Sequence, residues 1–256
     1  MKFHATPKRF LSVAGHRPPR LSEVAIERLG DAALLIRVGE RIEPELNRFV
    51  HALDATLRAQ TPAWLRDLVP AYASLAVHVD NAGFPADVDP LTEAERWVRE
   101  RLGRMSSTTP PAVGQTIEIV VSYGGEGGPD LDAVAAHCGL SAREVVQRHI
   151  AVEYRVAMLG FAPGFPYLLG LDPTLAVPRL AQPRVRVDAG SVAIGGAQTG
   201  IYPRPGPGGW RVIGRTAQVL FDPQREPSSL LPPSLLQPSL LQPGDRVRFV
   251  AIDVPA

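Results

Sequence analysis

The sequence predicts an α+β protein in which a small α/β sandwich domain is followed by a closed or nearly closed β-barrel domain. Strand and helix patterns alternate over residues 21–104, which is typical of one sheet covered by two helices. The polar, proline-containing stretch that follows resembles a linker. Several short strands separated by turn residues come next, which favours a barrel. We therefore expect a flexible tail, a sandwich domain, a linker and a barrel domain at residues 1–21, 22–104, 105–115 and 116–256, respectively.

In the first domain, apolar residues recur at helical spacing between short apolar runs. One apolar stripe predicts a helix over residues 45–60. The stripe consists of Leu46, Phe49, Val50, Leu53 and Leu57. Thr92 and Glu95 have the spacing of a capping box and predict a second helix over residues 90–104. Short strands are expected at residues 24–29, 32–38, 68–69 and 74–79.

In the second domain, two short helices precede most of the strands. Asp130 and Gly139 are the expected N-cap and end of the first helix. Ser141 and Glu144 form a capping box that begins the second helix. We expect these helices at residues 130–137 and 141–150. Strands are expected at residues 117–123, 154–159, 185–187, 192–194, 212–213, 218–221 and 246–252.

Residues 229–243 contain three copies of a five-residue unit, SLLPP, SLLQP and SLLQP. Proline at every fifth position excludes a helix, because each proline removes a backbone donor and clashes with the preceding turn. We expect a lengthened surface loop, which a barrel tolerates at small entropic cost.

The composition excludes several classes of protein. The chain has 256 residues and a formal net charge of +1, which argues against nucleic acid as a partner. Its apolar runs are too short to span a membrane, and its N-terminus lacks the apolar core of a secretory signal. Cys138 is the single cysteine, which fits a reducing cytoplasm. No HxxE, HxH or CxxC spacing is present, so we expect no metal held by this chain.

The segment Gly160–Trp210 is the most informative part of the chain. It contains ten glycines and eight prolines together with apolar and aromatic residues, which disordered tracts lack. Each glycine is expected to mark a positive φ or a close approach, and each proline a fixed turn. Such a segment shapes a binding surface more often than it fills a core.

The charges of this region predict a site for an anion. Residues 174–219 contain a single acid, Asp188, against six arginines. These are Arg179, Arg184, Arg186, Arg204, Arg211 and Arg215. Arginine presents a planar fork of donors that suits carboxylates and phosphates, so we expect an anionic small molecule or an acidic partner group to bind. A set of solvated arginines on strand faces is the alternative. The glycine-rich loop Gly124–Asp130 could also hold an anion on its backbone N–H groups, or it is a plain flexible loop.

The candidate substrate-binding residues are Arg179, Arg184, Arg186, Gln198, Thr199, Tyr202 and Tyr154. Gln198 and Thr199 lie between glycines, where polar side chains line pockets more often than they pack. Tyrosine hydroxyls can donate hydrogen bonds into a cleft, although a core aromatic is an alternative for Tyr154. His149 precedes the glycine-rich loop and is the candidate catalytic residue, which would assist proton transfer. A core or capping histidine is the alternative.

Long motifs in the second domain carry a resemblance to a known family. They are YGGEGGPDL (Tyr123–Leu131), GFAPGFPYL (Gly160–Leu168), AGSVAI (Ala189–Ile194), QTGIYP (Gln198–Pro203) and PGGW (Pro207–Trp210). On these motifs the chain resembles the family of bacterial 5-oxoprolinase B subunits, which is also called KipI or allophanate hydrolase subunit 1. The chain departs from the family pattern at Asp188, where proline is usual, and at Gly206, where serine is frequent.

The resemblance implies that the barrel is cyclophilin-like and that the C subunit, a KipA-like protein, is a tight partner. Together with the A and C subunits, members of the family hydrolyse 5-oxo-L-proline to L-glutamate in a reaction driven by ATP. Two other functions stay open. One is a regulatory module that inhibits a histidine kinase, and the other is a carboxyltransferase-type subunit of a urea or allophanate system.

The chain carries little chemistry of its own. No GxxxxGK[ST] phosphate loop is present, so ATP is expected at the level of the complex, without a binding site that can be located in this chain. Arginines, a glutamine, tyrosines and one histidine can bind and orient an anion, but they do not supply a strong base. We therefore expect half of an active site, which is completed by a partner protein.

Overall fold

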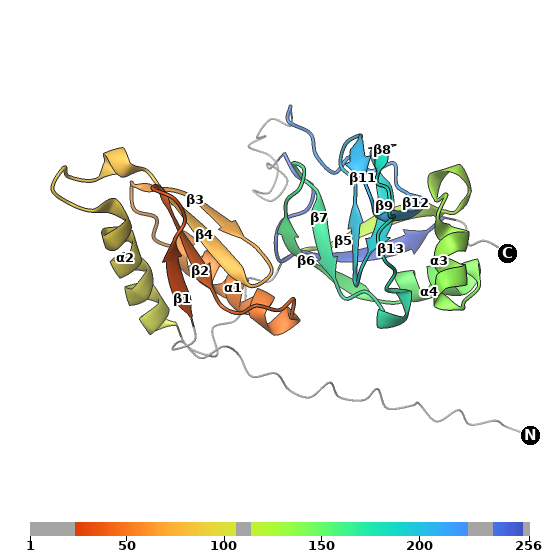
Figure 1. Cartoon of the computed structure of the whole chain (residues 1–256), viewed down its shortest axis with the longest axis horizontal. Coiled ribbons are helices and arrows are strands. Elements are labelled where there is room, and N and C mark those ends of the chain that lie inside the picture. The colour runs from red at the N-terminus through yellow and green to blue at the C-terminus, as the bar shows by residue number, and fades with distance from the viewer. Residues whose placement is uncertain (1–23, 106–113, 225–237, 253–256) are drawn as a thin grey trace, which may run out of the picture.

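The fold is provided by a computed structural model, which describes residues 24–105, 114–224 and 238–252. Figure 1 shows two units side by side, a sheet with two helices and a closed barrel. The predicted fold class is therefore confirmed. The predicted tail, residues 1–21, and most of the predicted linker lie outside the described residues.

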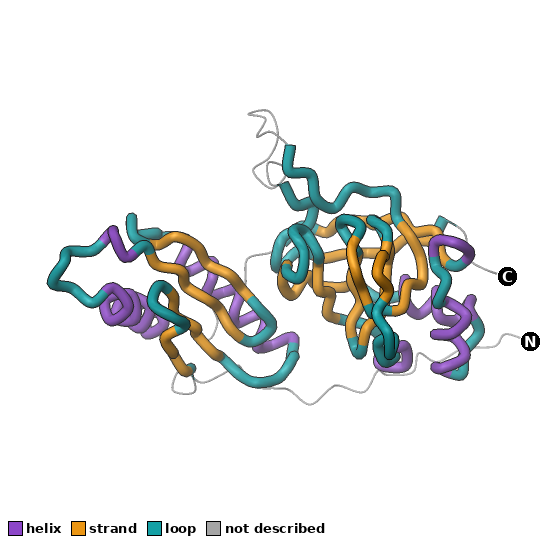
Figure 2. Tube along the Cα trace, turned by 45° about the horizontal axis from the view of Figure 1, so that its top comes forward, coloured by secondary structure: helices purple, strands orange, loops and turns teal. Residues whose placement is uncertain are grey.

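The first unit is a four-stranded antiparallel sheet with the strand order β1-β2-β4-β3. Two helices pack against the same face of this sheet, as Figure 2 shows. The core between them consists of buried aliphatic side chains from every layer, because the strands alternate and the helices present one apolar stripe. The elements are β1 (Ala25–Arg28), β2 (Ala33–Arg37), α1 (Pro44–Arg58), β3 (Leu65–Pro70), β4 (Ser74–Val79), η2 (Asn81–Gly83) and α2 (Pro90–Arg104).

The cap of α2 differs from the prediction. Asp89 is the N-cap residue and its carboxylate accepts a hydrogen bond from the backbone N–H of Leu91 at 3.3 Å. Thr92 donates its hydroxyl to the same carboxylate at 2.7 Å. The predicted capping box from Thr92 to Glu95 is therefore wrong, because Pro90 already fixes the first helical position and places the cap one residue before it.

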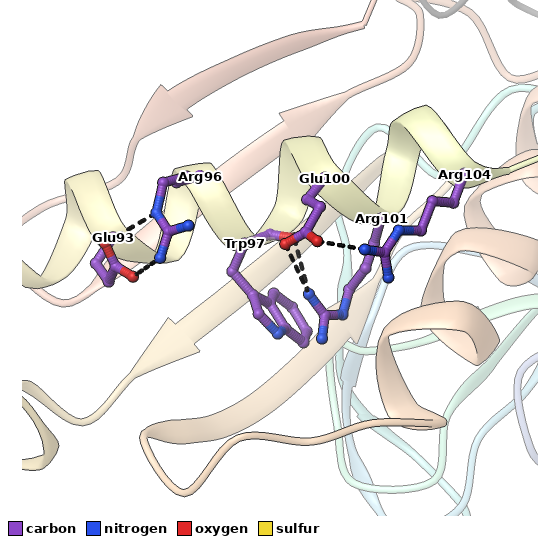
Figure 3. Close-up of polar contacts among 6 residues, drawn as sticks. All are labelled: Glu93, Arg96, Trp97, Glu100, Arg101 and Arg104. Atoms are coloured by element: carbon purple, nitrogen blue, oxygen red, sulfur yellow. Dashed lines mark hydrogen bonds and ion pairs between the residues drawn. The ribbon is translucent and has the colours of Figure 1, made fainter.

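The exposed face of α2 carries ion pairs at helical spacing (Figure 3). Glu93 pairs with Arg96, and Glu100 pairs with Arg104. The guanidinium of Arg101 lies 4.0 Å from the ring centre of Trp97. Exposed pairs of this kind contribute little to stability, and they indicate that this face of the helix is solvated.

The second unit is a closed barrel with the strand order β10-β7-β6-β13-β5-β12-β9. Strands β5 and β13 pair in parallel, and the other neighbours pair antiparallel. Strands β8 and β11 form a separate two-stranded ribbon. The barrel strands are β5 (Thr116–Tyr123), β6 (Glu153–Leu159), β7 (Pro166–Leu169), β9 (Ser191–Gly195), β10 (Gln198–Ile201), β12 (Arg211–Arg215) and β13 (Arg246–Ala251), and the ribbon is β8 (Arg184–Val187) and β11 (Gly206–Gly208).

Two helices cover the end of the barrel that lies away from the sheet (Figure 1). They are α3 (Leu131–Cys138) and α4 (Ala142–Ile150), with the short helices η3 (Gly125–Gly127) and η4 (Pro173–Leu175) nearby. The predicted capping box of α4 is confirmed, since Ser141 and Glu144 exchange their hydrogen bonds. Gly139 ends α3 in the left-handed conformation, as expected.

Several local predictions for the barrel are wrong. The sequence pattern does not predict strands β7 and β10, because β7 begins with a proline and β10 has a single large apolar residue, Ile201. The strand expected at residues 218–221 is reduced to one bridge between Phe221 and Ser239. Of the proline repeat, residues 229–237 lie outside the described residues. The last copy is not a surface loop, since Leu241 is fully buried in the barrel core.

The two units touch through a few specific contacts. Asn47 of α1 donates its side-chain amide to the carbonyl oxygen of Ala157 in β6 at 3.1 Å. Tyr72, in the turn between β3 and β4, places its ring 5.9 Å from that of Tyr167 in β7. The side-chain amide of Gln198 donates a hydrogen bond to the hydroxyl of Tyr72. The sheet unit therefore packs against the barrel beside the glycine-rich segment.

Candidate functional site

The glycine-rich segment builds a second cluster of aromatic rings, in which Phe165, Tyr202 and Trp210 are buried and Tyr167 is half-buried. We call Phe165, Tyr167, Tyr202 and Trp210 the aromatic platform. Their ring centres are 5.0–5.8 Å apart in edge-to-face arrangements, which suit the quadrupoles of aromatic rings. This cluster is separate from the core inside the barrel.

The glycines beneath the platform are explained by close approach of these rings. A Cβ added to Gly195 would lie 2.6 Å from the ring of Trp210. A Cβ added to Gly200 would lie 2.9 Å from the ring of Phe165. Real Cβ atoms do not come so close, so glycine at these two positions lets the rings lie against the strands.

Polar groups converge at the edge of the platform where the sheet unit meets the barrel. The guanidinium of Arg179 lies 5.7 Å from the ring centre of Trp210. The hydrogen bond between Gln198 and Tyr72 joins the two units at the same edge of the platform. We call Arg179, Gln198, Tyr72 and the platform the rim site. Burial raises the pKa of the Tyr72 hydroxyl, and the charge of Arg179 partly opposes this shift, so the phenol stays a hydrogen-bond donor.

A strained loop borders the rim site. Phe161 has a φ of 66°, which is rare for a residue with a side chain, and 64% of its surface is exposed. Its ring packs edge-on against Phe165 and Tyr202. A cavity of about 330 Å³ is lined by Leu159–Gly164. Strained backbone and an exposed aromatic residue often mark a binding site, which makes this loop part of the candidate surface.

A second group of arginines surrounds a different pocket. Arg184, Arg186 and Arg215 line a cavity of about 150 Å³ together with the loop Glu126–Pro129. Arg184 donates two hydrogen bonds to the buried carboxylate of Asp130, at 2.8 and 2.7 Å. The carboxylate of Asp130 therefore binds Arg184 and the backbone N–H of Val212, and it makes no cap hydrogen bond to α3, contrary to the prediction.

The positive charge of this pocket is largely neutralised. The remaining acid of the segment, Asp188, lies 3.1 Å from Arg186 and 3.7 Å from Arg215. Counting charges along residues 174–219 overestimates the positive charge of this pocket. The carboxylate of Asp130, which lies outside that stretch of sequence, neutralises Arg184. Arg184 has a structural partner and is held in place by it, which favours positioning over direct contact with a ligand.

The third group of predicted residues lies inside the barrel. His149 is fully buried, and its Nδ1 lies 2.8 Å from the hydroxyl of Tyr123. Its Nε2 lies 3.0 Å from the hydroxyl of Thr199, which donates its own proton to the carbonyl oxygen of Ala193. Nε2 must therefore carry the proton and Nδ1 accepts one from Tyr123. Tyr154 is also fully buried and donates to the carbonyl oxygen of His149 at 2.8 Å.

Burial keeps this histidine neutral. Loss of solvation lowers the pKa of His149 to about 3. With both ring nitrogens satisfied and no exposed surface, His149 fits the alternative of a core histidine. Its role in proton transfer stays a prediction that this geometry does not favour.

The structure thus divides the predicted site residues into three groups. Arg179, Gln198 and Tyr202 share the rim site, Arg184 and Arg186 share the second pocket, and His149, Thr199 and Tyr154 lie in the core. Five further members of the candidate surface are not selected by the sequence pattern, namely Tyr72, Phe161, Phe165, Tyr167 and Trp210. All except Tyr72 lie within the glycine-rich motifs, and no local signal joins Tyr72 to them.

Two further results concern only the described residues. Among residues 24–105, 114–224 and 238–252, no group of three or more His, Cys, Asp or Glu side chains is placed to hold a metal ion. In the same ranges, each helix is too short or too polar to cross a membrane.

Comparison with known proteins identifies the family of the chain. Residues 24–231 match the model of the carboxyltransferase domain, subdomain C and D. The chain belongs to this family. It is 43% identical over 232 residues to the 5-oxoprolinase B subunit of Bacillus subtilis, covering 89% of this chain and 92% of that protein. It is 48% identical over 184 residues to the 5-oxoprolinase B subunit of Escherichia coli O157:H7, covering 72% and 77%. The resemblance predicted from the motifs is confirmed.

Two solved structures share the fold. The crystal structure of TTHA0988 is 38% identical with a TM-score of 0.71 and covers 88% of this chain. This chain spans 41% of that longer chain. The Kluyveromyces lactis urea amidolyase has a TM-score of 0.70 over 92% of this chain and 15% of its own, but at 18% identity it shows the fold alone.

Proposed function

We propose that this chain is the B subunit of an ATP-dependent 5-oxoprolinase, which hydrolyses 5-oxo-L-proline to L-glutamate together with the A and C subunits. The observation that carries the proposal is the identity of 43% and 48% to two proteins named as 5-oxoprolinase B subunits, over most of their length. Members of one family at this identity commonly keep the same partners and substrate.

The rim site suits the substrate. 5-Oxoproline is a flat five-membered lactam that carries one carboxylate. The guanidinium of Arg179 can pair with the carboxylate, and the half-buried ring of Tyr167 can lie against the flat lactam. Gln198 supplies an amide for the polar edge of the lactam, whereas the buried Tyr202, with its hydroxyl against Gly208 and the backbone of Trp210, supports the platform.

The rim site is incomplete as a catalyst. Among its described residues it contains no carboxylate and no histidine, so it has no group that can act as a general base near pH 7. We propose that the C subunit, a KipA-like protein, supplies the base at the seam beside Tyr72 and Phe161. ATP would be bound within the assembled complex, and the A subunit is its third component.

Reconstitution of the complex tests the proposal. The three proteins are purified separately and mixed, and glutamate release from 5-oxoproline and ATP is measured with each one omitted in turn. We expect turnover only in the complete mixture. Full-rate turnover without this chain would remove it from the enzyme, and full-rate turnover by this chain alone would remove the shared site.

Single substitutions test the rim site within the active complex. Arg179→Gln should lower kcat/KM for 5-oxoproline by roughly 10–100-fold, because a charge-assisted hydrogen bond contributes about 1.5–3 kcal/mol. Arg204→Gln is the matched control, since Arg204 is also an exposed arginine of the glycine-rich segment but lies outside the rim site. Equal activity of the two variants would exclude Arg179 from the substrate site.

A second function is supported by the family itself. The matching family model describes a carboxyltransferase domain, which favours transfer of a carboxyl group to an amide. Transfer from carboxybiotin to urea by the assembled complex would establish this alternative, and its absence in a preparation that hydrolyses 5-oxoproline would exclude it. The histidine-kinase regulator stays a hypothesis, for which the test is inhibition of kinase autophosphorylation.

A further inference from the structure

A group of positive side chains lies between α1 and the barrel, outside the rim site. Arg155 of β6 and Arg246 of β13 are direct partners in the antiparallel register. Like charges opposite each other on neighbouring strands repel, so this pair needs compensation. We call Arg155, Arg246 and Arg48 of α1 the seam arginines.

Helix α1 is fixed over this pair by a buried contact. The side-chain amide of Asn47 donates to the carbonyl oxygen of Ala157 at 3.1 Å, two residues beyond Arg155 on β6. The charge of Arg48, the next residue on α1, acts on Arg155, so a third guanidinium lies near the pair. His51, one turn later, is buried beside the turn that leads to Arg246.

Arg155 itself is partly buried, and one of its donors is left without a partner. Its Nε is inaccessible to solvent and makes no hydrogen bond among the described residues. Burial lowers the pKa of Arg155, and the charges of Arg48 and Arg246 lower it further. A guanidinium nevertheless keeps its proton at physiological pH, so the positive charge of this half-buried side chain persists.

The neighbouring carboxylates are already engaged. Glu45 pairs with Arg48. Glu153 lies 3.4 Å from Arg246 and 3.0 Å from Arg248. Within the described residues, Arg155 has no ion pair. Residues 106–113, which connect the two units in sequence, contain no Asp or Glu.

We propose that the seam between α1 and strands β6 and β13 is a binding site for a small oxyanion, a carboxylate or a phosphate group, with Arg155 at its centre. A small oxyanion fits better than a partner side chain, because Arg155 is half-buried. This site is separate from the proposed substrate site and does not depend on the function of the complex.

Thermal unfolding of the full chain tests the site with inorganic phosphate as the probe. Phosphate is compared with chloride at equal ionic strength. At ten times its Kd, phosphate should raise the folding equilibrium constant about tenfold and raise Tm accordingly. The rise should be lost in Arg155→Gln and kept in Arg143→Gln, which replaces an exposed arginine of α4. No rise in the wild-type chain, or an equal rise in all three proteins, overturns the proposal.

A second readout separates binding from a structural role. Without phosphate, Arg155→Gln should have the same Tm as the wild type or a higher one, because an uncompensated charge has been removed. A clear fall in Tm would indicate that Arg155 holds the seam together, which contradicts the proposal. If phosphate and acetate have no effect while binding of a partner protein requires Arg155, the small-molecule site is excluded in favour of a carboxylate from that partner.

Discussion

Arg184 and Asp130 form a two-point ion pair across 54 residues of sequence, with both guanidinium nitrogens donating to the two carboxylate oxygens. Asp130 is buried and also accepts the backbone N–H of Val212 at 2.7 Å. The pair therefore joins the ribbon strand β8, the start of α3 and strand β12. This contact holds the glycine-rich segment against the barrel.

Removing one partner of this ion pair should lower the free energy of unfolding. Arg184→Met leaves the carboxylate of Asp130 buried with one backbone partner, and we expect a loss of about 1–3 kcal/mol in the free energy of unfolding. Arg186→Met, next but one on the same strand and 70% exposed, should change stability by less than about 0.5 kcal/mol. Urea unfolding measures both, and a double substitution Asp130→Asn with Arg184→Met should be less destabilising than the sum of its parts.

The neutral buried histidines predict a loss of stability in acid. Burial lowers the pKa of His149 to about 3 and that of His51 to about 4. In the unfolded chain each histidine takes up a proton near pH 6.5, whereas in the folded chain it stays neutral. The contribution of the two neutral histidines to stability is therefore complete above pH 6.5. It is lost as the pH falls towards the folded pKa values, by up to about 1.4 kcal/mol per pH unit for each group.

Denaturant unfolding at pH 7, 6 and 5 measures this effect. His149→Gln should lower stability at pH 7 and flatten the decline towards pH 5. His137→Gln, which replaces an exposed histidine of α3, is the matched control. A slope that His149→Gln does not alter would mean that His149 is accessible to protons in the folded chain.

Sequence separation between interacting residues decides which contacts could be predicted. The capping box of Ser141 and Glu144 was predictable because its partners are three residues apart. Asp130 is the N-cap residue of α3, as predicted, but its carboxylate pairs with Arg184 instead of the helix, and this could not be predicted because Arg184 is 54 residues away. The rim site could not be predicted for the same reason, since Gln198 and Tyr72 are 126 residues apart.

Burial was the other quantity that the sequence could not supply. Gln198 and Thr199 are neighbours on β10, so their side chains leave opposite faces of the strand. Gln198 reaches Tyr72 outside the barrel, and Thr199 reaches His149 inside it. The sequence pattern groups both as pocket residues, because alternation is not visible in a strand of only four residues with two polar members.

The contact between the two units should depend on Asn47. This fully buried side chain donates to the carbonyl oxygens of Ala71, Tyr72 and Ala157, at 3.2, 3.4 and 3.1 Å. Asn47→Ala should cost about 1–3 kcal/mol, because buried carbonyl groups lose their donor. Hydrogen exchange should also become faster in β6 and near Tyr72. Asn81→Ala removes an exposed amide that donates to Asp31 and is the control. Unchanged exchange in β6 would show that the units are held together by other contacts.

The glycines of the platform should respond to an added methyl group according to the space above them. In Gly200→Ala, the new Cβ would lie 2.8 Å from the backbone oxygen of Pro166 and 2.9 Å from the ring of Phe165. A backbone atom and a buried ring cannot both move aside, so we expect a loss of about 1–3 kcal/mol. Glycine at position 206 has nothing within 4 Å of an added Cβ, so Gly206→Ser should change the free energy of unfolding by less than about 0.5 kcal/mol. Near-ultraviolet circular dichroism should report a disturbed aromatic platform in the first variant only. If both variants unfold alike, close packing is not the reason for glycine at position 200.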